Sequence, residues 1–215
     1  MDAARDFAAD GNRVYVVSET REAGELREGE NLTVLEADPL QGDSVANAVR
    51  RVQEACGKLD LLVVGAGEHL PGDGEVGSHD YEAMMDVIGR NADGAYRLVE
   101  AFLPLLRAGE GKRIAVLTER SSSVSYCGQT GDFAYQMSLA MVNMMEKIYF
   151  NALRPEGFTF RNLAVDSNAE GTPAGGMGVK EYLEHGLCYD PDEPYIHSDE
   201  NRLVMRDRLH REIPW

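Results

Sequence analysis

The sequence predicts a doubly wound α/β fold, in which helices cover both faces of a parallel β-sheet. Two observations support this prediction. Short apolar runs of strand length alternate with longer segments of helical periodicity, and the run LDLLVVGAG (59–67) is apolar almost throughout before it ends in glycines. A strand that is apolar on both faces is typical of a buried parallel sheet. Alternating strands and helices connect parallel neighbours through crossover helices.

The first three elements follow from periodicity and strand propensity. Residues 2–10 place small and aromatic apolar side chains on one helical face, and Gly11 ends that run. The segment RVYVV (13–17) is β-branched and aromatic, which predicts a strand. NLTVLEAD (31–38) predicts a second strand, which ends where an Asp-Pro pair follows.

A helix, a buried strand and a long helix come next. DSVANAVRRVQEAC (43–56) carries apolar residues at helical spacing, and Asp43 or Ser44 is its expected N-terminal cap. The apolar run at 59–67 is the buried strand. A long helix is then predicted for about 81–106, interrupted in its middle by two glycines.

Three more elements complete the predicted core. KRIAVLTE (112–119) and FTFRNLAVD (158–166) are apolar, β-rich runs that predict strands, and AYQMSLAMVNMMEKIYFNAL (134–153) predicts the helix between them. We therefore interpret residues 1–173 as a single core domain. No internal repeat interrupts it.

The composition changes after the last predicted strand. We interpret residues 174–215 as a loop-rich C-terminal arm, and we predict no apolar strand in it. Its last segment, NRLVMRDRLHREIPW, is expected to form a short charged helix. The arm is expected to lie over the domain or to reach a partner subunit.

Composition bounds the class of protein. The 215 residues suffice for one sizeable α/β domain, and no apolar run approaches the length that spans a bilayer. The first residues, MDAARDFAAD, are acidic and amphipathic, so they do not resemble a signal peptide. Three widely spaced cysteines (Cys56, Cys127 and Cys188) argue against a disulfide framework and favour a cytoplasmic setting.

The formal net charge is −16, from 21 basic and 37 acidic residues. A surface of that sign repels nucleic-acid phosphates and anionic lipids, so we expect neither nucleic acid nor a membrane as a partner. We also expect no metal, because the nearest approach to a ligand pair is His185 and Cys188, and a lone pair does not make a site.

Two glycine clusters, GAGEHL (65–70) and GTPAGGMGVK (171–180), are candidates for a phosphate-binding loop. The first lacks the third glycine of the dinucleotide fingerprint, and the second lacks the spacing of a P-loop. A phosphate cradle needs backbone N–H groups that converge at a helix N-terminus. We therefore interpret both clusters as turns.

Tyr135 is the strongest candidate for chemistry, and its surroundings conflict with that role. A phenol titrates near pH 10, so it acts as an acid or base near neutrality only when a cation lowers its pKa. A lysine four residues further along the helix would supply the cation, but that position holds Leu139. The next lysine on the predicted helix is Lys147, three turns away.

Five segments occur in the order, and on the predicted elements, that one enzyme family shows. The chain thereby resembles the short-chain dehydrogenase/reductase family over roughly residues 3–173. The segments are LDLLVVGAG, similar to a strand that ends in N-N-A-G; NADG (91–94), similar to the helix segment with the active-site asparagine; KRIAVLTERSSSV, similar to the strand that delivers the catalytic serine; AYQMSLA, similar to A-Y-x-x-S-K-A without the lysine; and RNLAVDSNAEGTP, similar to the stretch after the next strand.

The resemblance implies a Rossmann-like fold and a set of catalytic residues. Tyr135 would be the proton donor, Ser122, thirteen positions earlier, would polarise a carbonyl, and Asn91 would hold a water relay. Ser121 and Ser123 compete for the serine role.

The resemblance also implies NAD(P) as cofactor. Glu19 would bind the adenosine ribose, Asp38 would lie near the adenine, and Gly65, Ala66 and Gly67 would line the site. A plain surface position is the alternative for Glu19.

Two departures from the family pattern bear on function. The lysine is Leu139, and the first strand and T-G-x-x-x-G-x-G turn that precede the family's first helix are not in this sequence. The missing strand would lie between those at 13–17 and 59–67. Those two strands close up, or another segment fills the gap, or the gene product begins further upstream.

Three hypotheses follow. In the first, the chain is a divergent, catalytically impaired relative that keeps the scaffold for binding or for assembly as a dimer or tetramer through the helices at about 81–106 and 134–153. In the second, it is an active NAD(P)-dependent oxidoreductase acting on a carbonyl or alcohol, and Lys147, Arg120 or Arg90 replaces the lysine. In the third, it is a sensor that binds a small-molecule ligand without reacting.

Overall fold

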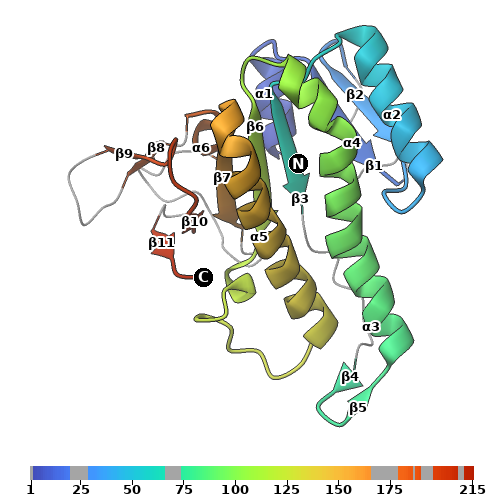
Figure 1. Ribbon diagram of the computed structural model, residues 1–215, viewed down its shortest axis with the longest axis vertical. Helices are drawn as coiled ribbons and strands as arrows, with labels where there is room; N and C mark the ends of the chain where they lie inside the picture. Colours follow the sequence, from blue (N-terminus) through green and yellow to red (C-terminus); the bar gives the residue numbers. More distant parts are fainter. Residues whose placement is uncertain are drawn as a thin grey trace.

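The apolar runs of the sequence form a mainly parallel sheet, which lies at the centre of the molecule (Figure 1). The computed structural model describes residues 2–19, 29–65, 74–165, 179–185, 187–189, 196–207 and 211–215. Its main sheet has the strand order β11-β10-β7-β6-β3, and all neighbours are parallel except β10 and β11. These strands are β3 (Leu61–Gly65), β6 (Arg113–Thr118), β7 (Thr159–Ala164), β10 (Met205–Arg206) and β11 (Glu212–Ile213).

The first two strands form a separate parallel pair. Strand β1 (Val14–Ser18) pairs along its length with β2 (Leu32–Glu36), and β1 does not pair with β3. Of the sequence-based alternatives for this gap, the closing up of β1 against β3 is therefore wrong. No strand of the described residues fills the interval, and the pair is joined to the main sheet through helix packing instead.

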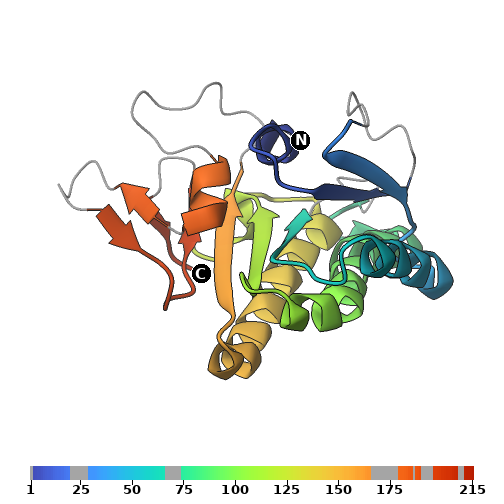
Figure 2. The same ribbon diagram turned by 90° about the horizontal axis from the view of Figure 1, so that it is seen from above.

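Three helices cover one face of the sheet, below the strands in Figure 2. They are α2 (Gly42–Ala55), α4 (Gly94–Ala108) and α5 (Phe133–Leu153). Their apolar faces meet the sheet in two clusters, one centred on α4, α5, β6 and β7, and one centred on α2 and β2. The second cluster holds the β1–β2 pair in place, because Tyr15 and Val17 pack into it.

Two helices lie on the opposite face, so the expected covering of both faces is confirmed (Figure 2). Helix α1 (Asp2–Ala9) packs against β1 and β2, and α6 (Val179–His185) packs against Leu163 through Tyr182. The two helices touch each other, because the Lys180 ammonium pairs with Asp10 and lies over the Phe7 ring. No described helix combines the length and apolarity that crossing a membrane requires.

The long helix expected at about 81–106 is present, with a change of winding where the glycines predicted an interruption. After the hairpin of β4 (Gly74–Glu75) and β5 (Ser78–His79), α3 (Tyr81–Ile88) leads into one π-helical turn (Gly89–Asp93) and then into α4. Such turns occur often at functional sites. The turn ends against the loop after β2, where a Cβ on Gly94 would lie 3.1 Å from the Pro39 Cβ.

One predicted cap and the predicted structure of the arm are wrong. The N-cap of α2 is Gln41, and the Ser44 hydroxyl accepts instead from the Asp38 backbone N–H at 3.1 Å. The described part of 201–215 contains the two-residue strands β10 and β11 rather than a charged helix. The arm also contributes β8 (Leu187–Tyr189) and β9 (Ile196–Ser198), which pair antiparallel.

Candidate active site

The predicted proton donor lies where α5 begins beside the carboxyl end of β6. Tyr135 is in the first turn of α5 and is 5% exposed. Its phenol donates a 2.8 Å hydrogen bond to Oε1 of Glu119, the residue that follows β6. A carboxylate therefore binds the phenol at the place where the chemistry of a proton donor requires a cation.

Leu139, at the position of the expected lysine, is completely buried. It packs with Val87 of α3 and with Ala134, and the partly buried Met84 and Ile88 close the same cluster. Burial, the Glu119 hydrogen bond and the charges of Glu119 and Asp132 all raise the pKa of the Tyr135 phenol well above its ordinary value. The site is thus set against ionisation of this tyrosine.

Two of the three basic residues considered as substitutes for the lysine make contacts of a different kind. Lys147 is exposed on α5, with its ammonium 4.8 Å from the Phe150 ring centroid. The Arg120 guanidinium lies over the Tyr126 ring and donates to Asp207 at 3.4 Å. Both sets of contacts are structural, and they attach Arg120 to the C-terminal arm.

The third basic residue, Arg90, neutralises the predicted ribose ligand. Its Nη1 donates to both carboxylate oxygens of Glu19, at 3.1 and 3.2 Å, and its Nε lies 3.5 Å from Asp86. Glu19 follows β1 and Arg90 lies in the π-helical turn, so the ion pair connects the carboxyl end of β1 to the helix that carries Asn91.

The predicted catalytic serine is 4% exposed and faces the interior. The Ser122 hydroxyl accepts from Asn143 Nδ2 at 2.9 Å and donates to Met205 Sδ at 3.5 Å. Of its two competitors, Ser121 donates to Glu119 Oε2 at 3.4 Å, and Ser123 donates to the Pro214 carbonyl. Ser121 therefore shares a carboxylate with the Tyr135 phenol, which spacing alone did not indicate.

Asn91 is connected to Tyr135 through Ser138. It is buried, and its Nδ2 donates to Ser138 Oγ at 3.0 Å. The Ser138 hydroxyl in turn donates to the backbone carbonyl of Tyr135 at 2.7 Å. The π-helical turn and the first turns of α5 are thus linked by side chains, and Asn91 serves in holding the two helices together.

Two of the remaining predicted cofactor ligands, Asp38 and Gly65, lie at or just beyond the carboxyl ends of strands. Asp38 accepts from the Leu40 N–H at 2.8 Å and so closes the turn after β2. Gly65 is the exposed last residue of β3, with open space where a Cβ would point. Ala66 and Gly67 lie outside the described residues.

The Arg90–Glu19 ion pair bears on how the adenosine half of a dinucleotide would bind. In a Rossmann fold, an acidic residue at a strand end accepts hydrogen bonds from the ribose hydroxyls, and the pyrophosphate lies at a turn beside the central strand. Here the acidic residue, Glu19, is bound by Arg90. The described residues place no strand between β1 and β3 from which that turn could lead.

The structure offers no metal alternative in the part of the chain that it describes. No group of three or more histidine, cysteine, aspartate or glutamate side chains comes together there. The side chains of His185 and Cys188 lie outside the described set.

Glu119 is the residue of the site that the sequence did not indicate. The signal was its position, because it directly follows a buried parallel strand, and ligand-binding residues gather at the carboxyl ends of such strands. The family pattern places the partner of Tyr135 four residues later on the same helix, at Leu139. The structure places it sixteen residues earlier, at Glu119.

The fold and the tyrosine on α5 define a dehydrogenase-type α/β protein, and comparison gives the family. A family model described as short chain dehydrogenase matches residues 1–165. The short-chain dehydrogenase/reductase atnB of Arthrinium sp is 30% identical over 184 residues, which cover 76% of this chain and 68% of that protein. The chain therefore belongs to the short-chain dehydrogenase/reductase family.

Other similarities agree with this assignment. The C-signal protein of Myxococcus xanthus is 40% identical over 83 residues, which cover 39% of this chain and 50% of that protein. The carbonyl reductase Sniffer of Caenorhabditis elegans superposes with a TM-score of 0.78 at 17% identity, covering 99% of this chain and 92% of that chain. At that identity the structural similarity establishes the Rossmann-like fold alone. The chain spans about half the length of several curated relatives that it matches.

Proposed function

We propose that the protein is a catalytically impaired short-chain dehydrogenase/reductase that keeps the scaffold for binding or oligomeric assembly. The bond between the Tyr135 phenol and the Glu119 carboxylate carries this proposal. A tyrosine that gives or takes a proton near neutrality needs a lowered pKa, whereas burial, Glu119 and Asp132 all raise the pKa of Tyr135. Leu139 supplies no charge to reverse the effect.

Cofactor binding points the same way. Members of the family generally bind NAD(P), and the carbonyl reductase from chicken fatty liver, a structural neighbour at 20% identity, is bound to NADPH. In this chain the Arg90–Glu19 ion pair occupies the acidic group that would bind ribose. Weak or undetectable binding of either dinucleotide is the expectation.

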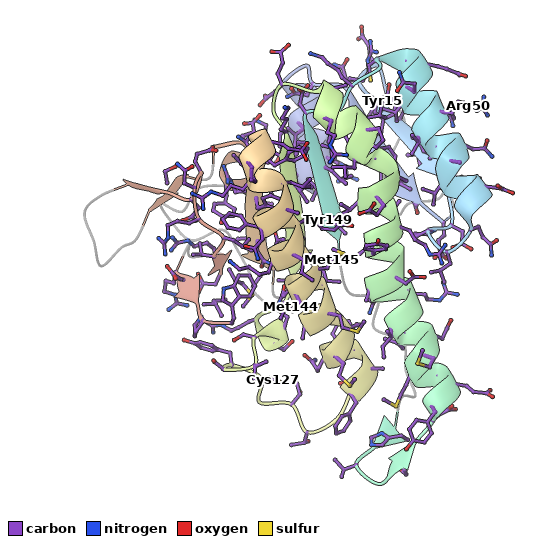
Figure 3. All side chains as sticks on the ribbon, viewed as in Figure 1. Tyr15, Arg50, Cys127, Met144, Met145 and Tyr149 are labelled. Atoms are coloured by element: carbon purple, nitrogen blue, oxygen red, sulfur yellow. The ribbon has the colours of Figure 1, made fainter. Side chains whose placement is uncertain are left out.

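The exposed face of α5 is the proposed assembly surface. Met137, Met141, Met144 and Ile148 recur at helical spacing, and they are 47%, 46%, 62% and 60% exposed. They form a continuous apolar stripe on a helix that lies on the outside of the molecule, where Figure 3 labels Met144. Water-exposed methionines on one face are typical of surfaces that pack against another protein. We propose that a second copy covers this stripe, in a dimer or tetramer.

An active NAD(P)-dependent oxidoreductase with Tyr135 as the proton donor is the alternative, and a ligand-binding sensor is a third possibility. Calorimetric titration with NADH and NADPH separates the first two. Saturable binding at submillimolar concentration, with turnover of a carbonyl that Tyr135→Phe abolishes, would establish the active enzyme. The proposal expects neither, and light scattering after size exclusion is expected to give at least a dimer.

The proposed location is the cytoplasm. This proposal rests on the three widely spaced cysteines of the sequence, of which Cys56 and Cys127 are exposed and form no disulfide with another described residue.

A further inference from the structure

A chain of buried polar side chains leads from Ser122 into the interface between α5 and β7. Asn143 Nδ2 donates to Ser122 Oγ at 2.9 Å, and Asn162 Nδ2 donates to Asn143 Oδ1 at 3.1 Å. The same Asn162 amide nitrogen donates to Glu146 Oε2 at 2.7 Å. Glu146 is 1% exposed and Asn162 is fully buried, so the chain ends in an acid that water does not reach.

Two acceptor atoms at the end of this chain have no hydrogen-bond donor among the residues that the structure describes. They are Glu146 Oε1 and Asn162 Oδ1. Buried polar atoms are nearly always paired, and an unpaired one costs about 1–3 kcal/mol. The two orphan atoms belong to the same two side chains that are already joined by the bond from Asn162 Nδ2 to Glu146 Oε2. One proton shared between them would satisfy both.

We infer that Glu146 is an uncharged carboxylic acid, whose O–H donates to Asn162 Oδ1 and closes a two-bond ring with the Asn162 amide. Asn162 then presents a fixed N–H to Asn143, and Asn143 holds the Ser122 hydroxyl in its inward position. Glu146 is thus a positioning residue for the predicted catalytic serine, acting from the same buried face of α5, one helical turn beyond Asn143. The inference holds whether or not the protein turns over a substrate.

Among the described residues, burial and the Asn162 hydrogen bond are the influences on Glu146, and neither is a charge that would stabilise its anion. From α5 it faces Asn143, from β7 Asn162, and beside them lie Met205 of β10 and Ser122.

The charged residues of the same two strands belong to the opposite face. Arg161 of β7 donates to Glu200 at 2.7 Å, and Arg206 of β10 donates to Asp199 at 2.9 Å. Alternation along a strand explains this, because Arg161 and Arg206 each lie one residue from a neighbour that faces α5. Lys147, the next residue on α5, is exposed.

Burial agrees with this geometry, since it raises the pKa of Glu146 to about 8 and outweighs the lowering effect of the Asn162 hydrogen bond. The folded protein then holds a proton that the unfolded chain releases above its ordinary pKa of 4.5. The protonated Glu146 therefore contributes its full share to the free energy of unfolding below about pH 4.5. This contribution is lost as the pH rises toward about 8.

Infrared spectroscopy tests the protonation state directly. At about pH 6.5, exposed carboxyl groups are ionised, so a C=O stretch of a protonated carboxyl reports a buried acid. Selective 13C labelling of glutamate carboxyls shifts this band, which assigns it to glutamate in the wild-type protein. We expect the band, and we expect Glu146→Gln to remove it. Absence of the band, or its persistence in Glu146→Gln, would overturn the inference. The exposed Glu110→Gln is the control that leaves the band unchanged.

Unfolding equilibria give an independent measurement. The unfolding constant of the wild type, divided by that of Glu146→Gln, is expected to rise by up to tenfold per pH unit between about 4.5 and about 8. A ratio that does not vary with pH would contradict the inference. If Glu146→Gln does not fold, the labelled wild-type spectrum decides the question alone.

The connection to the serine has its own readout. The side-chain amide resonances of Asn162 and Asn143 are expected to shift together as Glu146 ionises, and to stay fixed over the same pH range in Glu146→Gln. If the Asn162 resonance shifts and the Asn143 resonance does not, the hydrogen-bonded ring of Glu146 and Asn162 is supported. The same result would contradict the role of Glu146 in positioning Ser122.

Discussion

The Tyr135 phenol and the Glu119 carboxylate form a 2.8 Å hydrogen bond that connects the first turn of α5 to the end of β6. This bond reverses the electrostatics that a proton-donating tyrosine requires. An anion within hydrogen-bond distance stabilises the neutral phenol and opposes the phenolate.

Removal of the anion should therefore ease ionisation of the tyrosine. Glu119→Gln is expected to lower the pKa of Tyr135 toward its ordinary value, because the raising effects of the carboxylate disappear while burial remains. Ultraviolet difference titration against Tyr135→Phe isolates the signal of this phenol. Glu110→Gln, a change of the same kind at an exposed position, is the matched control. An unchanged Tyr135 titration in Glu119→Gln would show that the carboxylate does not govern this phenol.

Restoring the family's lysine should destabilise the protein. Leu139 is completely buried among apolar side chains of α3 and α5. Leu139→Lys removes a packed leucine and places an amine in that cluster, so we expect a loss of about 2–5 kcal/mol in the free energy of unfolding. Leu139→Met conserves volume and should cost less than about 1.5 kcal/mol. Urea unfolding measures both. If Leu139→Lys is as stable as Leu139→Met, the position tolerates a cation and the argument for impairment weakens.

The sequence predicted most of the fold because apolar runs and helical periodicity are local signals. Strands β3, β6 and β7 are apolar runs, and their existence needs no knowledge of their neighbours. The prediction that β3 is buried is wrong, because β3 lies at the edge of the main sheet with only Val64 buried and Val63 37% exposed. Strands β10 and β11 have two residues each, too few for any periodicity. They form because the arm reaches β7, where Met205 aligns with Asn162.

The candidate site was less predictable because contacts between distant residues decide its chemistry. The spacing of Tyr135 and Leu139 along one helix could be read directly from the sequence. The partner of Tyr135, Glu119, depends on how α5 docks across the end of β6. The pairing of Glu19 with Arg90 joins residues 71 positions apart, and no local pattern encodes it.

The Arg90–Glu19 pair should limit dinucleotide binding. In Arg90→Ala, Glu19 is released to accept hydrogen bonds from ribose, so its response to NADH is expected to exceed that of the wild type. The pair is about one-third to one-half exposed, so its loss should cost less than about 1 kcal/mol of stability. Asp86→Ala is the control, because it removes another partner of Arg90 and leaves Glu19 bound. Equal NADH titration curves for Arg90→Ala and the wild type would show that the Arg90–Glu19 ion pair does not limit dinucleotide binding.

The apolar stripe on α5 should mediate self-association. Met141→Glu places a charge in the middle of the stripe, and charges are depleted from the cores of interfaces. Light scattering after size exclusion is expected to show dissociation to a smaller species. Val76→Glu makes the same change at an apolar residue that is 76% exposed but lies outside the stripe, and it should leave the mass unchanged. A wild-type monomer, or equal masses for the wild type and Met141→Glu, would exclude this stripe as the interface.

The two glycines that bound the π-helical turn should respond differently to alanine. Both have helical backbone angles, and alanine in a helix is favoured over glycine by about 1 kcal/mol. At Gly89, a Cβ would meet nothing within 4 Å, so Gly89→Ala should gain stability. At Gly94, the Cβ would lie 3.1 Å from the Pro39 Cβ, and Pro39 has to shift. Gly94→Ala is therefore expected to be less stable than Gly89→Ala by at least about 1 kcal/mol in urea unfolding. Equal gains in both variants would mean that the loop after β2 yields freely, and that its contact with Gly94 does not fix the position of the turn that carries Asn91.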